Sequence, residues 1–450
     1  GTNPIAAGTS VTGTIYGGNK ADATGNTLNV YDSVTAGNIA NFDKVNFKAT
    51  SSHIAAGDTL LTLTTGATNF DWQKLHVDNL DNLNASATSD RILTLMHNGN
   101  NINLINYSTT GTRGRIQSDD YEADITTDGN NATSQNVYLK GYRFQNNTAN
   151  YAGGTATEAW GGRSIIGKTV TNNKLTLTGG SATLTARGGM VENTERDSGG
   201  NYKTNGDATK NTLVLNTGAQ TVSAYGAEVK TKAGSATENT AEITGGTTVH
   251  LYGASLTAAG ATGSATENKV NIKGGSVTGS VYGGHIADGA AIGDAKNNTI
   301  TVTGGSVTGD IYGGFTNGSG ATTGNTVNLG DGEHSLPTGT NIAGTIYGGN
   351  KADVTDNTLN VNTNATAGNI QNFGKLQFNL NSNALTQSAP MLQLSAVGGT
   401  NNLDWRTLDV NAEKFNAPIK TYEAYNLVLM ENGNGISFQQ GATNTYTVGG

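Results

Sequence analysis

One tetrapeptide, an aliphatic or small residue followed by an aromatic residue and two small ones, recurs through this chain and constrains its fold more than any other feature. Strict copies ending in Tyr-Gly-Gly stand at 15–18, 281–284, 311–314 and 346–349, and looser copies at 159–162, 224–227 and 251–254. From Tyr225 onward the aromatic positions are 27, 30, 30 and 35 residues apart. Self-similarity at such a period indicates a repeat array, in which each unit buries its apolar face only against its neighbours.

Residues 297–314 show how one repeat is built. Ile300 and Val302 alternate with threonines, which is the period-two pattern of a strand. The Gly-Gly pair at 304–305 interrupts that pattern and predicts a corner, and alternation resumes over 306–312. Short strands without helical periodicity predict an all-β fold, a parallel β-helix (β-solenoid) with coils of about 27–35 residues. A propeller is disfavoured because its blades run to ~40–45 residues and carry a Trp-Asp signature.

An asparagine opens the first strand of each repeat as regularly as Tyr-Gly-Gly closes the second. Asparagine tolerates the left-handed conformation and hydrogen-bonds to backbone groups. We therefore expect a structural amide ladder inside one corner of the stack. Its members are Asn211, Asn239, Asn268, Asn298, Asn325 and Asn357.

A second, longer duplication brackets the middle of the chain. Residues 13–100 and 344–434 share Gly-Thr-Ile-Tyr-Gly-Gly-Asn-Lys-Ala-Asp and several later motifs, at an offset of 331 to 334 residues. We predict a first long module, middle coils with two insertions, and a second copy of the long module. These are residues 1–110, residues 111–342 with insertions at about 111–136 and 188–210, and residues 343–450.

Composition limits the possible partners. The net charge of −8 argues against nucleic acid or an anionic lipid surface, since both require clustered Lys and Arg. The absence of Cys excludes disulfides and thiolate zinc sites. No apolar run approaches the ~20 residues of a membrane-spanning helix. We expect no cofactor.

The tyrosines of the repeat are the main candidate binding residues. By alternation they lie on the face opposite the aliphatic positions, so stacking would align Tyr225, Tyr252, Tyr282, Tyr312 and Tyr347 along the outside. Rings ~5 Å apart would offer a surface to sugar faces or to a partner protein. The alternative is a self-satisfied stack shielded by variable loops.

Two polar segments raise other possibilities. Asp119, Asp120, Glu122, Asp124 and Asp128 form the densest carboxylate cluster, a weak calcium candidate whose spacing matches no known calcium loop. Asp197-Ser198-Gly199-Gly200 is similar to the nucleophile loop of chymotrypsin-like proteases, but a serine nucleophile also needs a base and an orienting acid. A glycine-rich surface loop accounts for it better.

Carbohydrate-active enzymes also occur on β-helices and need carboxylates that converge in a groove. The acids of the middle coils are scattered instead. Glu238 and Glu267 occupy the same place in two Ala-Thr-Glu-Asn copies, which indicates a feature of the repeat and not a single active site. The threonine-rich strands are explained by strand propensity in preference to an ice-binding face.

The Gly-Gly-Ser-Val-Thr-Gly-x-Ile-Tyr-Gly-Gly pattern of 304–314, with Asn-Thr-Val-Asn-Leu at 325–329 between copies, resembles passenger domains of Gram-negative autotransporters (type V secretion), particularly adhesins. The resemblance implies a right-handed parallel β-helix exported to the outer membrane and cell surface, possible self-association, and release into the medium. It implies membrane contact only through a C-terminal barrel, whose strand pattern this sequence does not show.

On this basis we expect a non-enzymatic adhesin that binds a host-cell or bacterial surface protein or glycan along its length. The alternative is a polysaccharide lyase or glycosidase on the same fold. The sequence shows no catalytic motif in its expected context.

Overall fold

The computed structural model describes residues 10–21, 24–48, 54–78, 83–108, 116–117, 120–181, 183–193, 204–386, 388–395, 401–415 and 427–438. The chain divides into two compact units, residues 1–149 and 150–450. Among the described residues the secondary structure consists of strands and single-turn 3₁₀ helices. The protein is therefore all-β, as the alternating pattern predicted.

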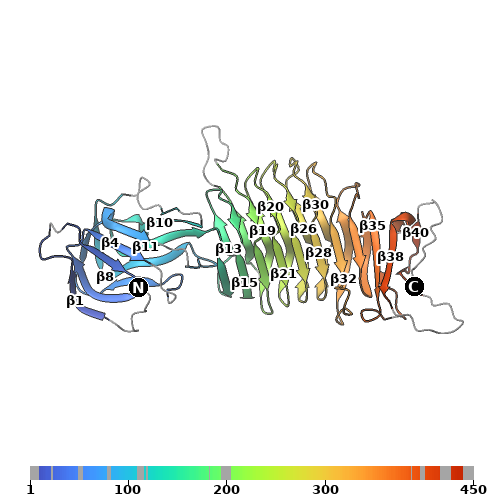
Figure 1. Cartoon of the computed structure of the whole chain (residues 1–450), viewed down its shortest axis with the longest axis horizontal. Coiled ribbons are helices and arrows are strands. Elements are labelled where there is room, and N and C mark those ends of the chain that lie inside the picture. The colour runs from blue at the N-terminus through green and yellow to red at the C-terminus, as the bar shows by residue number, and fades with distance from the viewer. Residues whose placement is uncertain are drawn as a thin grey trace. The chain divides into compact units, whose positions relative to one another are not determined.

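In the described part of the second unit, two long parallel sheets run through successive repeats (Figure 1). We name one the tyrosine sheet. Its strands are β13 (Glu158–Ser164), β16 (Thr185–Val191), β19 (Gln220–Val229), β22 (Thr247–Leu256), β25 (Ser276–Val277), β26 (Val281–Ile286), β29 (Ser306–Val307), β30 (Ile311–Thr316), β32 (Asn341–Gly349), β34 (Ala365–Gln371), β36 (Leu392–Leu394) and β39 (Met430–Asn432).

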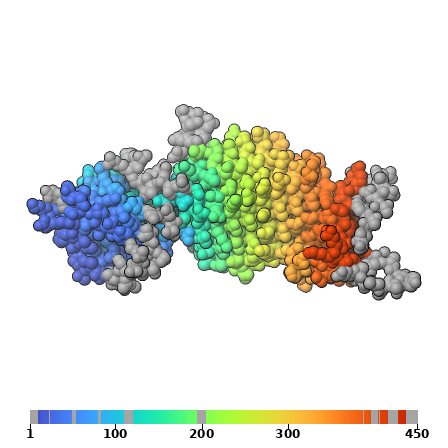
Figure 2. All heavy atoms as spheres, viewed as in Figure 1, coloured from blue at the N-terminus to red at the C-terminus, as the bar shows by residue number. Residues whose placement is uncertain are grey.

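The other long sheet, which we name the threonine sheet, carries the Asn-Thr segment of each repeat. Its strands are β12 (Thr148–Ala152), β15 (Lys174–Gly179), β18 (Thr212–Leu215), β21 (Thr240–Ile243), β24 (Lys269–Ile272), β28 (Thr299–Val302), β31 (Thr326–Leu329), β33 (Thr358–Val361), β35 (Lys375–Asn381) and β38 (Leu408–Lys414). Figure 2 shows the atoms of this unit as bands that follow the residue number.

A short third sheet lies where each repeat turns toward its asparagine. It contains β14 (Val170–Thr171), β17 (Ala208–Thr209), β20 (Ala236–Thr237), β23 (Ala265–Thr266) and β27 (Ala295–Lys296). Near the end of the unit, β37 (Asn401–Leu403) pairs in parallel with β40 (Ile436–Phe438), and the 3₁₀ helix η3 (Trp405–Thr407) precedes β38.

The register between repeats places like residues side by side. In the threonine sheet Ala241 pairs with Val270, which pairs with Ile300. All three are completely buried, whereas the residues just before and just after each of them in its strand are half-buried or exposed. Each row of the core thus receives one aliphatic side chain from every repeat. Alternation therefore fixes which face each strand turns inward.

The first unit combines parallel and antiparallel pairing. Its larger sheet runs β1 (Ser10–Tyr16), β3 (Val34–Ala40), β5 (Thr59–Leu63), β8 (Arg91–Ile105), β11 (Thr133–Arg143), β10 (Tyr121–Thr127) and β9 (Ile116–Gln117), with β6 (Thr68–Asp71) also on β8. Pairing is parallel as far as β8 and antiparallel beyond it. A second sheet holds β2 (Thr27–Val30), β4 (Lys44–Lys48) and β7 (Leu75–Asp78), and η1 (Trp72–Lys74) and η2 (Asp128–Asn130) are 3₁₀ turns.

Two segments that the sequence assigned to insertions contribute strands. Residues 121–127 and 133–136 belong to β10 and β11, whose antiparallel pairing extends the first unit to residue 149. Residues 188–191 belong to β16 and residues 208–209 to β17. In β10 and β11 polar composition misled the prediction, because antiparallel strands with one exposed face carry many polar residues. β16 and β17 instead pair in parallel, and residues 188–191 are buried. Residues 194–203 lie outside the described part of the chain.

Candidate functional site

The repeat tyrosines form one continuous stack on the tyrosine sheet. Parallel register pairs Tyr225, Tyr252, Tyr282, Tyr312 and Tyr347 in succession. Their ring centroids lie 4.5, 4.9, 5.4 and 4.7 Å apart, and their planes diverge by only 5–9°. Every ring is half-buried. We call this row the tyrosine ladder.

The stacking of repeats explains the first glycine after each tyrosine. A Cβ at Gly283 would lie 2.3 Å from the carbonyl oxygen of Gly313, and one at Gly313 would lie 2.4 Å from that of Gly348. Real Cβ atoms do not approach that closely, so any side chain here would push the repeats apart. The residue after each tyrosine must therefore be glycine, because the backbone of the next repeat lies against it.

The second small residue makes room for the asparagine of the neighbouring strand. A Cβ at Gly284 would meet Asn298 Nδ2 at 2.6 Å, and one at Gly314 would meet Asn325 Nδ2 at the same distance. Two motifs that are distant within the repeat are thus in contact. The sequence showed both motifs but gave no signal that they touch.

The asparagines form a buried ladder of hydrogen bonds. The Nδ2 of each donates to the Oδ1 of the next, at 2.9 Å from Asn211 to Asn239 and 3.0 Å from Asn239 to Asn268. Each backbone N–H donates to the same oxygen, as from Asn239 to Asn268 at 3.0 Å. The row continues through Asn298 and Asn325 to Asn357, and Asn173 adds a member before Asn211. All seven side chains are buried.

The left-handed conformation, which asparagine tolerates, is adopted at each corner by a different residue. The ladder asparagines do not have positive φ; the residue before each of them does. These residues are Asn172, Lys210, Glu238, Glu267, Asn297, Gly324 and Asp356, with φ from 55° to 71°. The asparagine is selected by its amide group, because a buried polar group needs partners, and the preceding turn bears the strain.

The orientation of the tyrosine rings corrects the expectation that they offer their faces to sugars. Each interior ring has one neighbour on each face, so a ligand is limited to the ring edges and hydroxyls. The guanidinium of Arg187 lies 5.8 Å from the ring centroid of Tyr225, at the first end of the ladder. The surface is therefore a row of phenol edges.

Two further columns flank the ladder, and the sequence analysis did not single them out. Ser255, His285 and Phe315 lie in register three residues after successive tyrosines. The His285 ring centroid is 5.3 and 4.8 Å from those of Tyr252 and Tyr282, and its Nδ1 lies 2.9 Å from Ser255 Oγ. Burial, with a contribution from His250, lowers the pKa of His285 to about 4.

The other column lies two residues before each tyrosine and is polar. Its members are Ser223, His250, Ser280, Asp310 and Thr345. Asp310 accepts hydrogen bonds from the Tyr312 hydroxyl at 3.2 Å and from the Thr345 N–H at 2.8 Å. Burial raises the pKa of Tyr225, Tyr252, Tyr282 and Tyr312, so these phenols stay protonated at neutral pH.

A buried ion pair stands beside the first rung. Arg187 Nε donates to Glu228 Oε2, and Arg187 Nη1 lies 3.2 Å from Glu158 Oε1. Arg187 and Glu228 are each only 5% exposed. Arg187 pairs in register with Tyr225 of the next repeat, and Glu228 pairs with Ser255. At the beginning of the ladder, a charged residue therefore occupies the position that tyrosine takes in the following repeats.

The calcium candidates do not assemble into a metal site among the described residues, where no group of three or more His, Cys, Asp or Glu side chains is placed to hold an ion. Although burial raises it, hydrogen bonds from Tyr138, Asn136 and Ser134 keep the pKa of Asp128 below its usual value. Glu122 is buried and Asp124 is exposed on β10. Asp119 and the Asp197-Ser198-Gly199-Gly200 segment lie outside the described residues.

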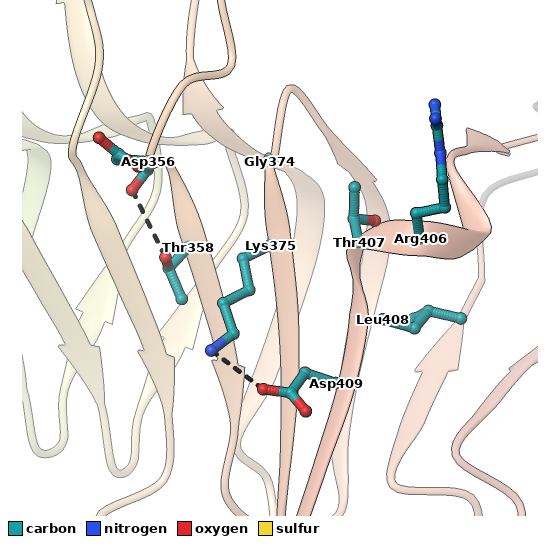
Figure 3. A pocket seen from close by; sticks show the side chains of 8 residues that line it. All are labelled: Asp356, Thr358, Gly374, Lys375, Arg406, Thr407, Leu408 and Asp409. Carbon is teal, nitrogen blue, oxygen red and sulfur yellow. Dashed lines mark hydrogen bonds and ion pairs between the residues drawn. The ribbon is translucent and has the colours of Figure 1, made fainter. Parts of the chain in front are cut away.

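A polar hollow of about 520 Å³ opens on the threonine sheet beside η3 (Figure 3). It is lined by Asp356, Thr358, Gly374, Lys375, Arg406, Thr407, Leu408 and Asp409. Lys375 Nζ lies 3.0 Å from Asp409 Oδ2, and Arg406 pairs with Asp404 outside the lining. Its cations are thus already neutralised, and the hollow resembles a gap between strands more than a charged binding site.

A comparison with family models, curated proteins and solved structures finds no match for this chain. Within the described residues, no helix has the length and apolar character needed to cross a membrane.

Proposed function

We propose that the second unit is a right-handed parallel β-helix and that the chain is an exported surface protein of the autotransporter-passenger type. Support comes from sheets in which each strand pairs in parallel with its counterpart one repeat later, at 27–35 residues. Right-handed crossovers between parallel strands are the strong preference of polypeptide chains. The resemblance of the repeat pattern to adhesin passengers supports a location at the cell surface.

Its role is adhesion without catalysis, and the tyrosine sheet is the contact face. The observation that carries this proposal is the tyrosine ladder, which keeps half-exposed aromatic side chains in line over five repeats. Tyrosine is favoured at binding surfaces because it adds large contact area and a hydroxyl at low entropic cost. A regular row of moderate contacts suits multivalent binding.

Beads coated with the full chain test this function. We expect them to adhere to host epithelial cells or to bacterial cells, and soluble chain to compete. Beads coated with a Tyr282→Ser, Tyr312→Ser variant of matched fold, checked by circular dichroism, should adhere less. Absence of adhesion to both cell types contradicts the proposal. Release of reducing sugar from any polysaccharide would instead favour the carbohydrate-active alternative.

A further inference from the structure

The tyrosine ladder presents a periodic row of hydroxyl groups, and this geometry narrows what it can bind. Because neighbouring rings cover each other's faces, a ligand meets the edges and hydroxyls of rings whose centroids lie 4.5–5.4 Å apart. A phenol hydroxyl both donates and accepts a hydrogen bond. A ligand that contacts every rung must therefore repeat its own hydroxyl groups at nearly the same interval.

The polar column beside the ladder adds a second row of hydrogen-bonding groups. At each repeat a tyrosine hydroxyl is accompanied by a hydroxyl, imidazole or carboxylate two residues earlier, at Ser223, His250, Ser280, Asp310 and Thr345. At Tyr312 the two groups are bonded to each other, the hydroxyl donating to Asp310 at 3.2 Å, so each pair offers its remaining hydrogen-bonding positions to a ligand in a fixed relation. Such paired groups match the adjacent hydroxyls of a sugar ring.

The charge of the surface excludes the common anionic polymers. From Tyr252 to Tyr347, the ladder and its two flanking columns contain no Lys or Arg, and Asp310 is the one carboxylate; all these residues are described in the structure. Arg187, at the first end, is committed to Glu228 and Glu158. Sulfated or uronic-acid polymers would find no free cation here, and binding of such polymers depends on clustered cations.

We propose that the tyrosine ladder binds an extended, uncharged, β-linked polysaccharide lying along the stack, with about one sugar per repeat. This inference rests on the proposed adhesive function and specifies its ligand. An extended β-linked chain advances by about the length of one sugar ring per residue, close to the spacing of the rungs. Each hydrogen bond is weak in water, so retention arises from many rungs acting together.

The test is retention of the full chain on insoluble polysaccharides. The probes are amorphous cellulose, chitin and a linear β-1,3-glucan, with α-linked amylose and heparin resins for comparison. We expect retention on at least one β-linked probe, little on amylose or heparin, and no loss in 0.5 M salt. Retention on heparin alone, release by salt, or no retention on any β-linked probe overturns the proposal.

A hydroxyl-deletion variant tests the mechanism while leaving the stack intact. Tyr252→Phe, Tyr282→Phe, Tyr312→Phe keeps the rings but removes three hydroxyls, and we expect at least a tenfold loss of retention. The circular dichroism spectrum should be unchanged, with a small fall in melting temperature because the hydrogen bond from Tyr312 to Asp310 is lost. Tyr16→Phe, Tyr31→Phe is the matched control, since both side chains are exposed in the first unit. Equal retention of the triple variant overturns the proposal. If coated beads still adhere to cells while no polysaccharide is retained, the adhesive function stands and this inference falls.

Discussion

At the scale of single residues, the residue type allowed at a position depends on the atoms that it contacts in the neighbouring repeat. Gly283 is required by the carbonyl of Gly313, and Asn268 by its amide neighbours on both sides. The aliphatic positions tolerate more variation, since Ala241, Val270 and Ile300 follow one another in the same row. The strictest positions in the repeat are thus those where backbone or amide groups meet.

Replacement of Gly283 by alanine should destabilise the second unit. The added Cβ would meet Gly313 O at 2.3 Å and Asn298 Cβ at 2.8 Å. We expect a loss of at least ~2 kcal/mol in the free energy of unfolding, measured by urea titration. Gly289→Ala is the control, since nothing lies within 4 Å of its Cβ position. Equal effects of the two substitutions would refute the steric account.

Replacement of Asn268 by alanine should be at least as costly. It removes the acceptor of the Asn239 N–H and Nδ2 and the donor to Asn298 Oδ1 and Ala236 O. Leaving buried polar groups unpaired costs ~1–3 kcal/mol each, so we expect a loss of ~3–5 kcal/mol. Asn271→Ala, on the outer face of the strand β24 that follows Asn268, should change stability by less than ~0.5 kcal/mol. A small effect at Asn268 would mean that water replaces its bonds.

At the scale of the strand, the column three residues after each tyrosine differs most between repeats. Serine, histidine and phenylalanine succeed one another at 255, 285 and 315 in one register row. The core side of the same strands keeps its aliphatic character. The repeats therefore differ from one another on their outer face. His285 adds a titratable group to a cluster that is otherwise aromatic.

His285 should make stability depend on pH. Its folded pKa of about 4 lies below the ordinary value of 6.5, so between these values the unfolded chain binds a proton that the folded chain does not. Stability therefore falls as the pH is lowered from 6.5 to 4, by up to ~3 kcal/mol from this group. The groups facing it are His250, Ser255 and the aromatic rings of Tyr252, Tyr282 and Phe315.

Chemical unfolding at pH 4, 5, 6 and 7 checks this dependence. His285→Phe places the residue of the next repeat in the same column, and we expect it to reduce the loss of stability at low pH. The control is His334→Gln, because His334 is exposed and its pKa is raised by Asp331, the opposite direction. An identical pH profile for wild type and His285→Phe would rule out this origin.

At the scale of the whole molecule, the two units are held together internally in different ways. The first mixes parallel strands with the antiparallel strands β10 and β11, whereas the described long sheets of the second pair in parallel from repeat to repeat. Stacked repeats gain stability from their nearest neighbours, so a repeat array can fold without a distant partner.

Residues 150–450 produced alone should therefore fold. We expect a β-sheet circular dichroism spectrum and a cooperative melt, with near-ultraviolet tyrosine signal retained. Residues 240–450, which begin within the array and remove Asn211, Tyr225 and the Arg187–Glu228 pair, are the comparison and should melt at lower temperature. An unfolded 150–450 fragment would show that this unit depends on residues before 150.

The sequence by itself determined the all-β class, the length of the repeat and the residues that recur, because period-two alternation and Tyr-Gly-Gly spacing are local properties. It also showed that like residues should stack, since register follows from a regular repeat. Only the tertiary structure decided which groups meet between repeats: the glycine under the next carbonyl, the asparagine beneath the second glycine, and tyrosine faces closed by one another. The glycine–carbonyl and tyrosine–tyrosine contacts join residues 27 to 35 apart, and the contacts of the second glycine with asparagine join residues 14 apart at Gly284 and 11 apart at Gly314. Their geometry depends on how the strands stack, which no local pattern encodes.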